Sequence, residues 1–208
     1  MAEYKLKTPI AEDAVRKLKV KDVVYVSGVM FTARDEAHHR AIEHHRKGKK
    51  FPLDTNGLVL YHCGPVVRKV NEGWRVVAAG PTTSTRMDIF EDEFIKNFKV
   101  RMVVGKGGMG QRTTEAMKEF GAVYCAFTGG TAVLAAKSIK EVDRVEWLDL
   151  GIPEAVWVFD VENFGPLIVA IDAHGNNIYS DVMGEVERNK KRIYEQIGIR
   201  TKPLNKEL

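Results

Sequence analysis

Two glycine-ended loops near the middle of the chain constrain its fold and its function more than any other feature. The first loop reads Gly80-Pro81-Thr82-Thr83-Ser84-Thr85-Arg86, and the second reads Gly105-Lys106-Gly107-Gly108. Each loop follows an apolar, strand-like run and precedes residues with helical spacing. Loops of this kind aim backbone N–H groups at one point, and here each adds a cation, which suits an anionic ligand. The sequence therefore predicts an anion-binding site formed by both loops.

A third cation, Arg34, lies at the end of another predicted strand, residues 22–32, and just before a predicted helix at residues 38–50. Ligands of α/β sheets bind at the carboxyl ends of strands, so Arg34 is a candidate for the same site. An ion pair with Asp35 or Glu36 at the surface accounts for its position equally well. Asp35 is also a candidate cap of the helix. The position of Arg34 alone leaves both interpretations open.

The hydrophobic periodicity predicts an α/β fold, with a single domain over residues 1–208 in which helices cover a mixed sheet. Gly28 within a strand predicts a bulge or a close backbone approach, and Asp88 and Gly121 are the expected cap and stop of two helices. Strands are predicted at residues 4–8, 22–32, 57–67, 74–80, 100–104, 122–130, 144–150, 155–159 and 164–171, with a hairpin turn at Asn71-Glu72-Gly73. Helices are predicted at residues 12–18, 38–50, 89–98, 113–120, 131–139 and 182–197.

The charges of the chain are nearly balanced, with 32 basic and 28 acidic residues and a net charge of +4. This excess is too small to predict a nucleic-acid or membrane partner. No run approaches the roughly 20 apolar residues of a membrane span and no apolar leader opens the chain, so a cytoplasmic location is expected. The segment around His38 and His45 is predicted to be a solvated helix. These two histidines are seven residues apart, which places them two helical turns apart and too far from each other to ligate one ion. No metal-ligating residue is expected in this chain.

Cys63 and Cys125 are the only cysteines, and their spacing is typical of neither a zinc site nor a disulfide framework. Cys63 lies in an apolar run and is predicted to be a small buried side chain. The second loop also differs from a nucleotide-binding motif. In a phosphate loop the lysine follows the second glycine and precedes serine or threonine, whereas Lys106 stands between Gly105 and Gly107. A nucleotide ligand is therefore disfavoured.

Three segments together resemble a known family: Thr32-Ala33-Arg34-Asp35, Gly80 to Met87, and Gly105 to Met109. In this order they are similar to the signature of the β subunit, or C-terminal domain, of class I iron–sulfur fumarate hydratases and L(+)-tartrate dehydratases. The resemblance spans nearly the whole chain and implies a swivelling β/β/α domain. It also implies a hydro-lyase that reversibly dehydrates (S)-malate to fumarate, a step of the tricarboxylic acid cycle. The alternative substrate that it implies is L-tartrate, which yields oxaloacetate.

The resemblance also implies roles for four residues. Thr82 is implied to be the base that removes the carbon-bound proton, while Arg34, Arg86 and Lys106 are implied to bind the substrate carboxylates. It further implies a [4Fe-4S] cluster held by three cysteines of a partner α subunit, in a heterodimer or an α2β2 complex. Two cysteines are too few to hold such a cluster, which agrees with a separate α subunit.

Two further interpretations stay open beside the enzymatic one. Thr82 can cap the following helix or bind substrate without moving a proton, since a threonine hydroxyl is a weak base unless Arg86 or Lys106, the two other catalytic candidates, lies nearby and lowers its pKa. The basic segment at residues 38–50 can also make the chain a non-enzymatic binding module for nucleic acid. The affinity of such a module would fall steeply with added salt.

Overall fold

The computed structural model describes residues 1–71 and 73–198, and the chain divides into two compact units, the second of which begins at Ile178. The first unit contains one large sheet in the strand order β1-β2-β3-β6-β7-β9-β8 and a hairpin of β4 and β5. The strands are β1 (Glu3–Lys7), β2 (Val23–Thr32), β3 (Val59–Tyr61), β4 (Val66–Val70), β5 (Gly73–Ala78), β6 (Met102–Gly105), β7 (Val123–Ala126), β8 (Ile139–Glu146) and β9 (Val156–Ile171). The helices are α1 (Glu12–Val15), α2 (Asp35–Arg46), α3 (Asp88–Phe98), α4 (Gln111–Phe120) and α5 (Ala132–Ser138), with 3-10 turns η1 (Ser84–Arg86) and η2 (Leu148–Leu150).

The large sheet closes into a barrel because its two longest strands pair with each other. β9 runs antiparallel to β2, and it also pairs with β7. Strands β2, β3, β6 and β7 are parallel to one another, so their carboxyl ends lie at one edge of the barrel. β1 and β8 extend the sheet beyond the barrel. The predicted α/β fold with helices on a mixed sheet is confirmed, and the closure is a feature that local periodicity does not reveal.

Alternate residues of the barrel strands fill its interior. Residues two apart on each strand belong to one fully buried apolar cluster: Val24 and Val26 of β2, Val59 and Tyr61 of β3, and Met102 and Val104 of β6. This spacing is the two-residue period of side chains on a strand. In β3 and β6 the intervening residues Leu60 and Val103 are buried as well, because helices cover the outer face of the sheet there. Phe31 of β2, for example, stacks on Phe94 of α3 with 6.4 Å between the ring centroids.

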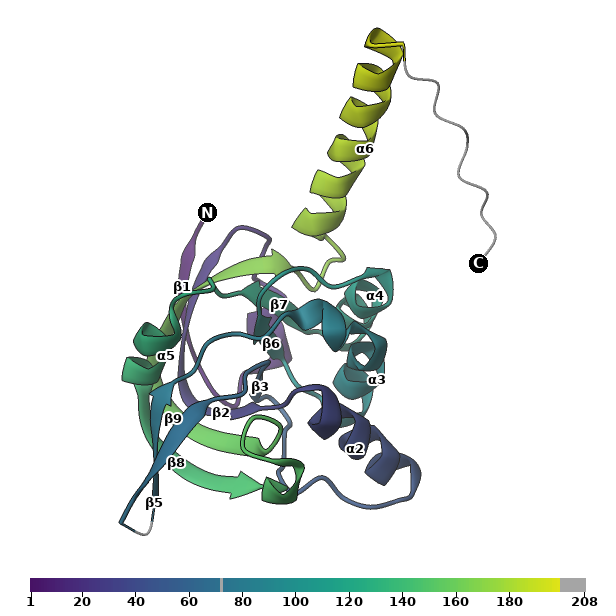
Figure 1. Ribbon diagram of the computed structural model, residues 1–208. Helices are drawn as coiled ribbons and strands as arrows, with labels where there is room; N and C mark the ends of the chain where they lie inside the picture. Colours follow the sequence, from purple (N-terminus) through teal and green to yellow (C-terminus); the bar gives the residue numbers. More distant parts are fainter. Residues whose placement is uncertain (72, 199–208) are drawn as a thin grey trace. The chain divides into compact units, whose positions relative to one another are not determined.

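Helices α2, α3 and α4 lie side by side on one flank of the sheet, whereas α5 lies on another flank near β5 and β8 (Figure 1). Two residues separate the end of β2 from the start of α2, and α4 follows the loop after β6. α3 follows the first glycine-ended loop. The loops that carry the predicted site residues therefore join strand ends to helix N-termini.

The C-terminal strands differ from the predicted ones. The strand predicted at 144–150 is instead β8 over Ile139–Glu146, followed by the turn η2. The strands predicted at 155–159 and 164–171 form the single strand β9. β9 stays paired with β2 through two register shifts, near Val161 and Phe164, and the irregular residues between them resemble a loop in the sequence.

Two local predictions in the N-terminal half are confirmed. β4 and β5 form the predicted hairpin, although Glu72 of its turn lies outside the described residues. Gly28 adopts a φ of 97°, and a Cβ atom added there would lie only 2.6 Å from Oγ1 of Thr8. Glycine is therefore required for the close approach of the segment after β1 to β2.

The predicted caps of α2 and α3 are wrong. Asp35 and Asp88 are the first residues of these helices and do not occupy the cap positions. Asp35 instead pairs with both nitrogens of the Arg86 fork, over 3.1 and 2.5 Å. Asp88 accepts the backbone N–H of Gly110 over 2.8 Å, at the N-terminus of α4. Each aspartate thus joins two segments, because a partner from a neighbouring loop lies within reach of its carboxylate.

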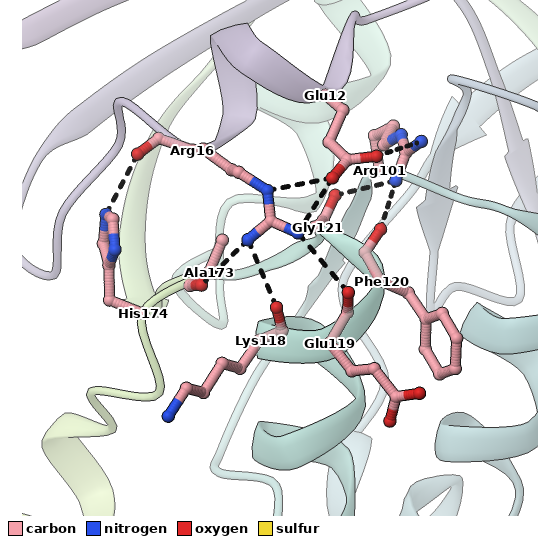
Figure 2. A network of polar contacts seen from close by, with 9 residues as sticks. All are labelled: Glu12, Arg16, Arg101, Lys118, Glu119, Phe120, Gly121, Ala173 and His174. Atoms are coloured by element: carbon pink, nitrogen blue, oxygen red, sulfur yellow. Dashed lines mark hydrogen bonds and ion pairs between the residues drawn. The ribbon is translucent and has the colours of Figure 1, made fainter.

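Two arginines bind the carboxyl end of α4 (Figure 2). Glu12 of α1 lies between them, with Oε1 2.8 Å from Nη2 of Arg16 and Oε2 3.0 Å from Nη2 of Arg101. Cations are favoured at this end of a helix because its last carbonyl groups point outward. The network therefore attaches α1 to α4. Arg16 and Arg101 donate hydrogen bonds to the carbonyl groups of Lys118, Glu119, Phe120 and Gly121.

We expect Arg101→Met to lower the free energy of unfolding by about 1–3 kcal/mol, because the end of α4 loses its charged donor. The side chain of Arg16 is 38% exposed, against 15% for that of Arg101, so Arg16→Met should cost less. Urea unfolding measures both changes. Arg144→Met, at an exposed position of β8, is the control and should change stability by less than about 0.5 kcal/mol. Full stability of Arg101→Met would contradict the role of the network.

The second unit contains helix α6 (Ile178–Gln196), which corresponds to the helix predicted at 182–197. Val182, Val186 and Ile193 are exposed apolar residues at helical spacing on it. No helix within residues 1–71 and 73–198 is both long and apolar enough to cross a membrane.

Candidate anion-binding site

Residues that follow three parallel strands meet at one edge of the barrel. Arg34 follows β2, His62 follows β3 and Lys106 follows β6. The strand pairing continues past β3, since the backbone N–H of His62 donates to the carbonyl of Val104 over 2.8 Å. This is the edge of a parallel sheet at which ligands bind.

The first glycine-ended loop lies between the ends of β3 and β6. The backbone N–H of Thr82 donates to the carbonyl of His62 over 2.7 Å, and that of Lys106 donates to the carbonyl of Thr82 over 3.3 Å. The N–H of Ser84 donates in turn to the carbonyl of Lys106 over 2.9 Å. Main-chain hydrogen bonds therefore hold Thr82 between the two strand ends and next to Lys106.

The side chains of Thr82 and Lys106 keep their polar groups available. Thr82 is half-buried, and Lys106 is exposed. Within residues 1–71 and 73–198, no carboxylate pairs with Lys106 and no side chain hydrogen-bonds to the Thr82 hydroxyl. A cation and a hydroxyl without partners in this part of the chain thus stand on adjacent backbone segments, where both can contact an anion.

Arg34 and Arg86 are held by carboxylates at the same edge. Nε of Arg34 lies 3.2 Å from Oε1 of Glu154, so its partner is not a sequence neighbour. Its guanidinium also lies against Gly64, where an added Cβ would stand 2.6 Å from Nη1. Arg86 pairs with Asp35, which directly follows Arg34. The structure therefore brings Thr82 to Lys106, and Arg34 to the neighbourhood of Arg86 through Asp35.

A fully buried cluster lies behind this edge and is missing from the sequence-based prediction. It consists of His38, Glu91 and His62, and we call it the His–Glu–His cluster. Oε2 of Glu91 lies 3.0 Å from Nε2 of His62 and 3.5 Å from Nε2 of His38. The prediction of a solvated helix is wrong at His38, because this residue shares the buried face of α2 with Ala41 and Ile42. The three ligand atoms lie within 4.8 Å of one another, so the cluster is also a candidate metal site.

Charge within the His–Glu–His cluster is set by burial and by the three groups themselves. Burial disfavours the charged form of Glu91, but His62 and His38 outweigh it and hold the pKa of Glu91 at about 2. Burial lowers the pKa of His62, and Glu91 opposes that change. At neutral pH the cluster therefore contains a carboxylate that accepts a hydrogen bond from a neutral His62.

We expect Glu91 to stabilise the fold fully above about pH 4.5, its ordinary pKa, and to lose this contribution as the pH falls toward 2. The sign follows because the unfolded chain takes up the proton first. Glu91→Gln cannot ionise, so it should be less stable than the parent at pH 7, by an amount of order 3 kcal/mol. Urea unfolding at several pH values should show this difference shrink as the pH falls through that range. A difference independent of pH would contradict a charged Glu91.

The two cysteines do not fit an iron–sulfur cluster. Cys63 and Cys125 are both fully buried, as predicted for Cys63, and neither forms a disulfide. Burial raises the pKa of Cys63 to about 12 and also raises the pKa of Cys125. Neither residue therefore offers the thiolate that a cluster needs at neutral pH.

The chain is similar to known proteins along most of its length. The family model described as "Fumarase C-terminus" matches residues 1–182. A protein of Methanocaldococcus jannaschii, provisionally named L(+)-tartrate dehydratase subunit beta, is 50% identical over 185 residues, which make up 88% of this chain and 91% of that protein. The L(+)-tartrate dehydratase subunit beta of Escherichia coli is 45% identical over 192 residues, 92% of this chain and 94% of its own. A protein of Geobacillus stearothermophilus, provisionally named fumarate hydratase class I, is 44% identical over 178 residues, 85% of this chain but 34% of that protein.

The family model covers most of the chain, and the segments around Arg34, Thr82 and Lys106 lie inside the matched range. Two of these relatives are similar to this chain along almost their whole length. The chain therefore belongs to the fumarase C-terminus family, as a hydro-lyase subunit of the class I fumarate hydratase and L(+)-tartrate dehydratase type.

Proposed function

We propose that this chain is the β subunit of an L(+)-tartrate dehydratase, which removes water from L-tartrate to give oxaloacetate. The observation that carries the proposal is the agreement in both identity and length with the two β subunits of that name. In the relative named fumarate hydratase, the matched region is only 34% of a longer chain. Interconversion of (S)-malate and fumarate, the main expectation from the sequence, is therefore the second candidate. It uses the same residues, since malate differs from tartrate by one hydroxyl group.

The three cations of the site are proposed to bind the two carboxylates of the substrate. Lys106 is exposed and has no carboxylate partner in the described part of the chain, so it can accept an incoming carboxylate directly. Arg34 and Arg86 already bind the carboxylates of Glu154 and Asp35. A substrate carboxylate would replace these side chains on the guanidinium forks. Each charge-assisted hydrogen bond of this kind contributes about 1.5–3 kcal/mol.

Thr82 is proposed to remove the proton on the carbon next to a carboxylate. Such a proton is weakly acidic, so preorganised cations must stabilise the enolate-like dianion that forms. A threonine hydroxyl also needs a cation that stabilises its alkoxide. The hydrogen bond between the Lys106 N–H and the Thr82 carbonyl keeps these two residues adjacent, which supports Lys106 in this role.

A partner α subunit is proposed to carry the [4Fe-4S] cluster, in a heterodimer or an α2β2 complex. The support within this chain is that Cys63 and Cys125, its only cysteines, do not fit a cluster. The name "subunit beta" of the relatives also points to a second subunit. We therefore expect the isolated chain to be inactive.

A nucleic-acid-binding module is the disfavoured alternative. A solvated basic helix would leave its cations free for phosphates, whereas several basic residues of α2 and its end are neutralised by carboxylates. These ion pairs are Arg40 with Asp149, Arg46 with Glu93 and Lys47 with Glu43.

The test is anaerobic co-expression with a candidate α subunit, followed by assays with L-tartrate, (S)-malate and fumarate. We expect kcat/KM for L-tartrate to exceed that for malate by at least about tenfold, the worth of one well-placed hydrogen bond. A preference for malate would support the second candidate. A complex that carries its cluster and dehydrates none of these compounds would show that the proposed function is wrong, as would turnover by the isolated chain.

A further inference from the structure

The His–Glu–His cluster contacts two segments of the site, the backbone at Arg34 and the loop that carries Thr82 and Arg86. His38 comes from α2, Glu91 from α3 and His62 from the end of β3, and all three are fully buried. Nδ1 of His38 lies 2.7 Å from the carbonyl oxygen of Arg34. Nδ1 of His62 lies 2.9 Å from Oγ of Ser84, two residues after Thr82. Each histidine therefore faces Glu91 with one ring nitrogen and a site segment with the other.

The partners of the rings fix the direction of these hydrogen bonds. A carbonyl only accepts, so His38 must carry a proton on Nδ1 to bond to Arg34. A carboxylate also only accepts, so His62 carries its proton on Nε2 and donates to Glu91 over 3.0 Å. Nδ1 of a neutral His62 then accepts from the Ser84 hydroxyl, and Ser84 Oγ accepts from the hydroxyl of Tyr124 over 3.0 Å. The two histidines are thus opposite tautomers, and Nε2 of His38 donates no hydrogen bond to Glu91.

The backbone near the cluster is adapted to these contacts. A Cβ atom added to Gly105 would lie 1.9 Å from Ser84 Oγ and 3.3 Å from Nδ1 of His62. Any other residue at position 105 would therefore displace the Ser84 hydroxyl. Gly105 directly precedes Lys106, so the end of β6, the first loop and His62 form one close-packed unit.

We propose that His38 and His62 are positioning residues, which hold the main chain at Arg34 and the loop of Thr82 through their Nδ1 atoms, with Glu91 orienting the ring of His62. The inference rests on the proposed function, because it assigns the cluster to the placement of that site. Packing alone would need no polar groups here, and a buried carboxylate is costly unless its partners are well placed. The cluster thereby sets the distance between Arg34 and the loop that carries the Thr82 hydroxyl.

Amide substitutions separate the two ring nitrogens. Asparagine places a polar atom near the position of Nδ1, whereas glutamine places one near that of Nε2. His62→Asn should keep the contact with Ser84 and lose the Glu91 contact, so kcat/KM should stay within about tenfold of the parent while stability falls. His62→Gln should keep more stability but lose about 100-fold in kcat/KM, the cost of misplacing reacting groups by about 1 Å. His38→Asn should keep the contact with the Arg34 carbonyl and a kcat/KM within about tenfold, whereas His38→Gln should lose both.

This crossed order of activity and stability is the result that a merely structural role would not give. Activity that follows stability in the two His62 variants, or equal activity of His38→Asn and His38→Gln, would overturn the proposal. His45→Gln, on the exposed end of α2, is the matched control and should change neither property. The affinity of the complex for L-tartrate, measured by calorimetry, should rank the histidine variants in the same order and does not require turnover. A failure of the proposed function is therefore distinguishable from a failure of the positioning role.

Two measurements on the purified full-length chain test the hydrogen-bond directions. Long-range ¹⁵N NMR should show His38 protonated at Nδ1 and His62 at Nε2. The same tautomer for both rings would overturn the proposal. Elemental analysis after purification without added metal should find no bound divalent ion. A stoichiometric ion that is lost in His38→Ala would show that the cluster is a metal site and not a positioning unit.

Discussion

Thr82→Val should lower kcat of the complex with L-tartrate by about 10²- to 10⁴-fold, the usual contribution of a positioned base. Valine has nearly the shape of threonine and lacks only the hydroxyl. The loop should stay in place, because it is held by main-chain bonds to His62 and Lys106 rather than by the Thr82 side chain. KM should change by less than about threefold if the cations provide most of the binding. Steady-state assays of oxaloacetate formation measure both constants.

Thr82→Ser is the matched control for this change, since it keeps a hydroxyl at the same position. Its kcat should stay within about tenfold of the parent. Exchange of the substrate C–H with solvent deuterium is an independent readout, which Thr82→Val should abolish if Thr82 moves the proton. A Thr82→Val complex with nearly full kcat would place the base elsewhere.

The sequence indicates the strand ends of the site well, because these depend on local patterns. The apolar run of β2 and its junction with α2 are set by side-chain periodicity over about a dozen residues. The loop from Gly80 to Arg86 is likewise readable, since glycine, proline and short hydroxyl side chains are typical of loops. Parallel strands then place such loops at one edge, even though their exact neighbours stay unknown.

Contacts between distant segments could not be predicted in the same way. Closure of the barrel depends on the pairing of β2 with β9, which lie more than 100 residues apart in the chain. The Glu154 partner of Arg34 comes from the loop before β9, so it also depends on that closure. No local pattern specifies either contact, because register between distant strands is decided by the packed core.

The burial of His38 was within reach of the sequence, by contrast. His38 and Ile42 are four residues apart, with Ala41 between them, and this spacing marks one face of a helix. The neighbouring charges of the segment favour a solvated helix, and that interpretation overlooks the apolar stripe. A histidine on the apolar face of a helix next to a site cation is the signal that would have indicated the His–Glu–His cluster.

Arg34→Lys should lower kcat/KM for L-tartrate by about 10- to 100-fold, chiefly through KM, because lysine cannot bind a carboxylate with two parallel hydrogen bonds. One lost charge-assisted bond of about 1.5–3 kcal/mol corresponds to this range. Arg40→Lys is the matched control. Arg40 lies on α2, the helix that directly follows Arg34, and binds Asp149 with two nitrogens over 2.9 and 2.7 Å. The Arg40→Lys substitution should leave kcat/KM within about twofold of the parent.

Gly64→Ala tests the same contact while leaving the arginine in place. The added Cβ would stand 2.6 Å from Nη1 of Arg34 and 2.7 Å from the carbonyl oxygen of Pro153, so the guanidinium must move. We expect kcat/KM to fall in the same direction as in Arg34→Lys. The double variant should then be little worse than the poorer single variant, since both changes remove one interaction. Additive losses, or a Gly64→Ala enzyme with normal KM, would show that the position of this guanidinium does not determine substrate binding.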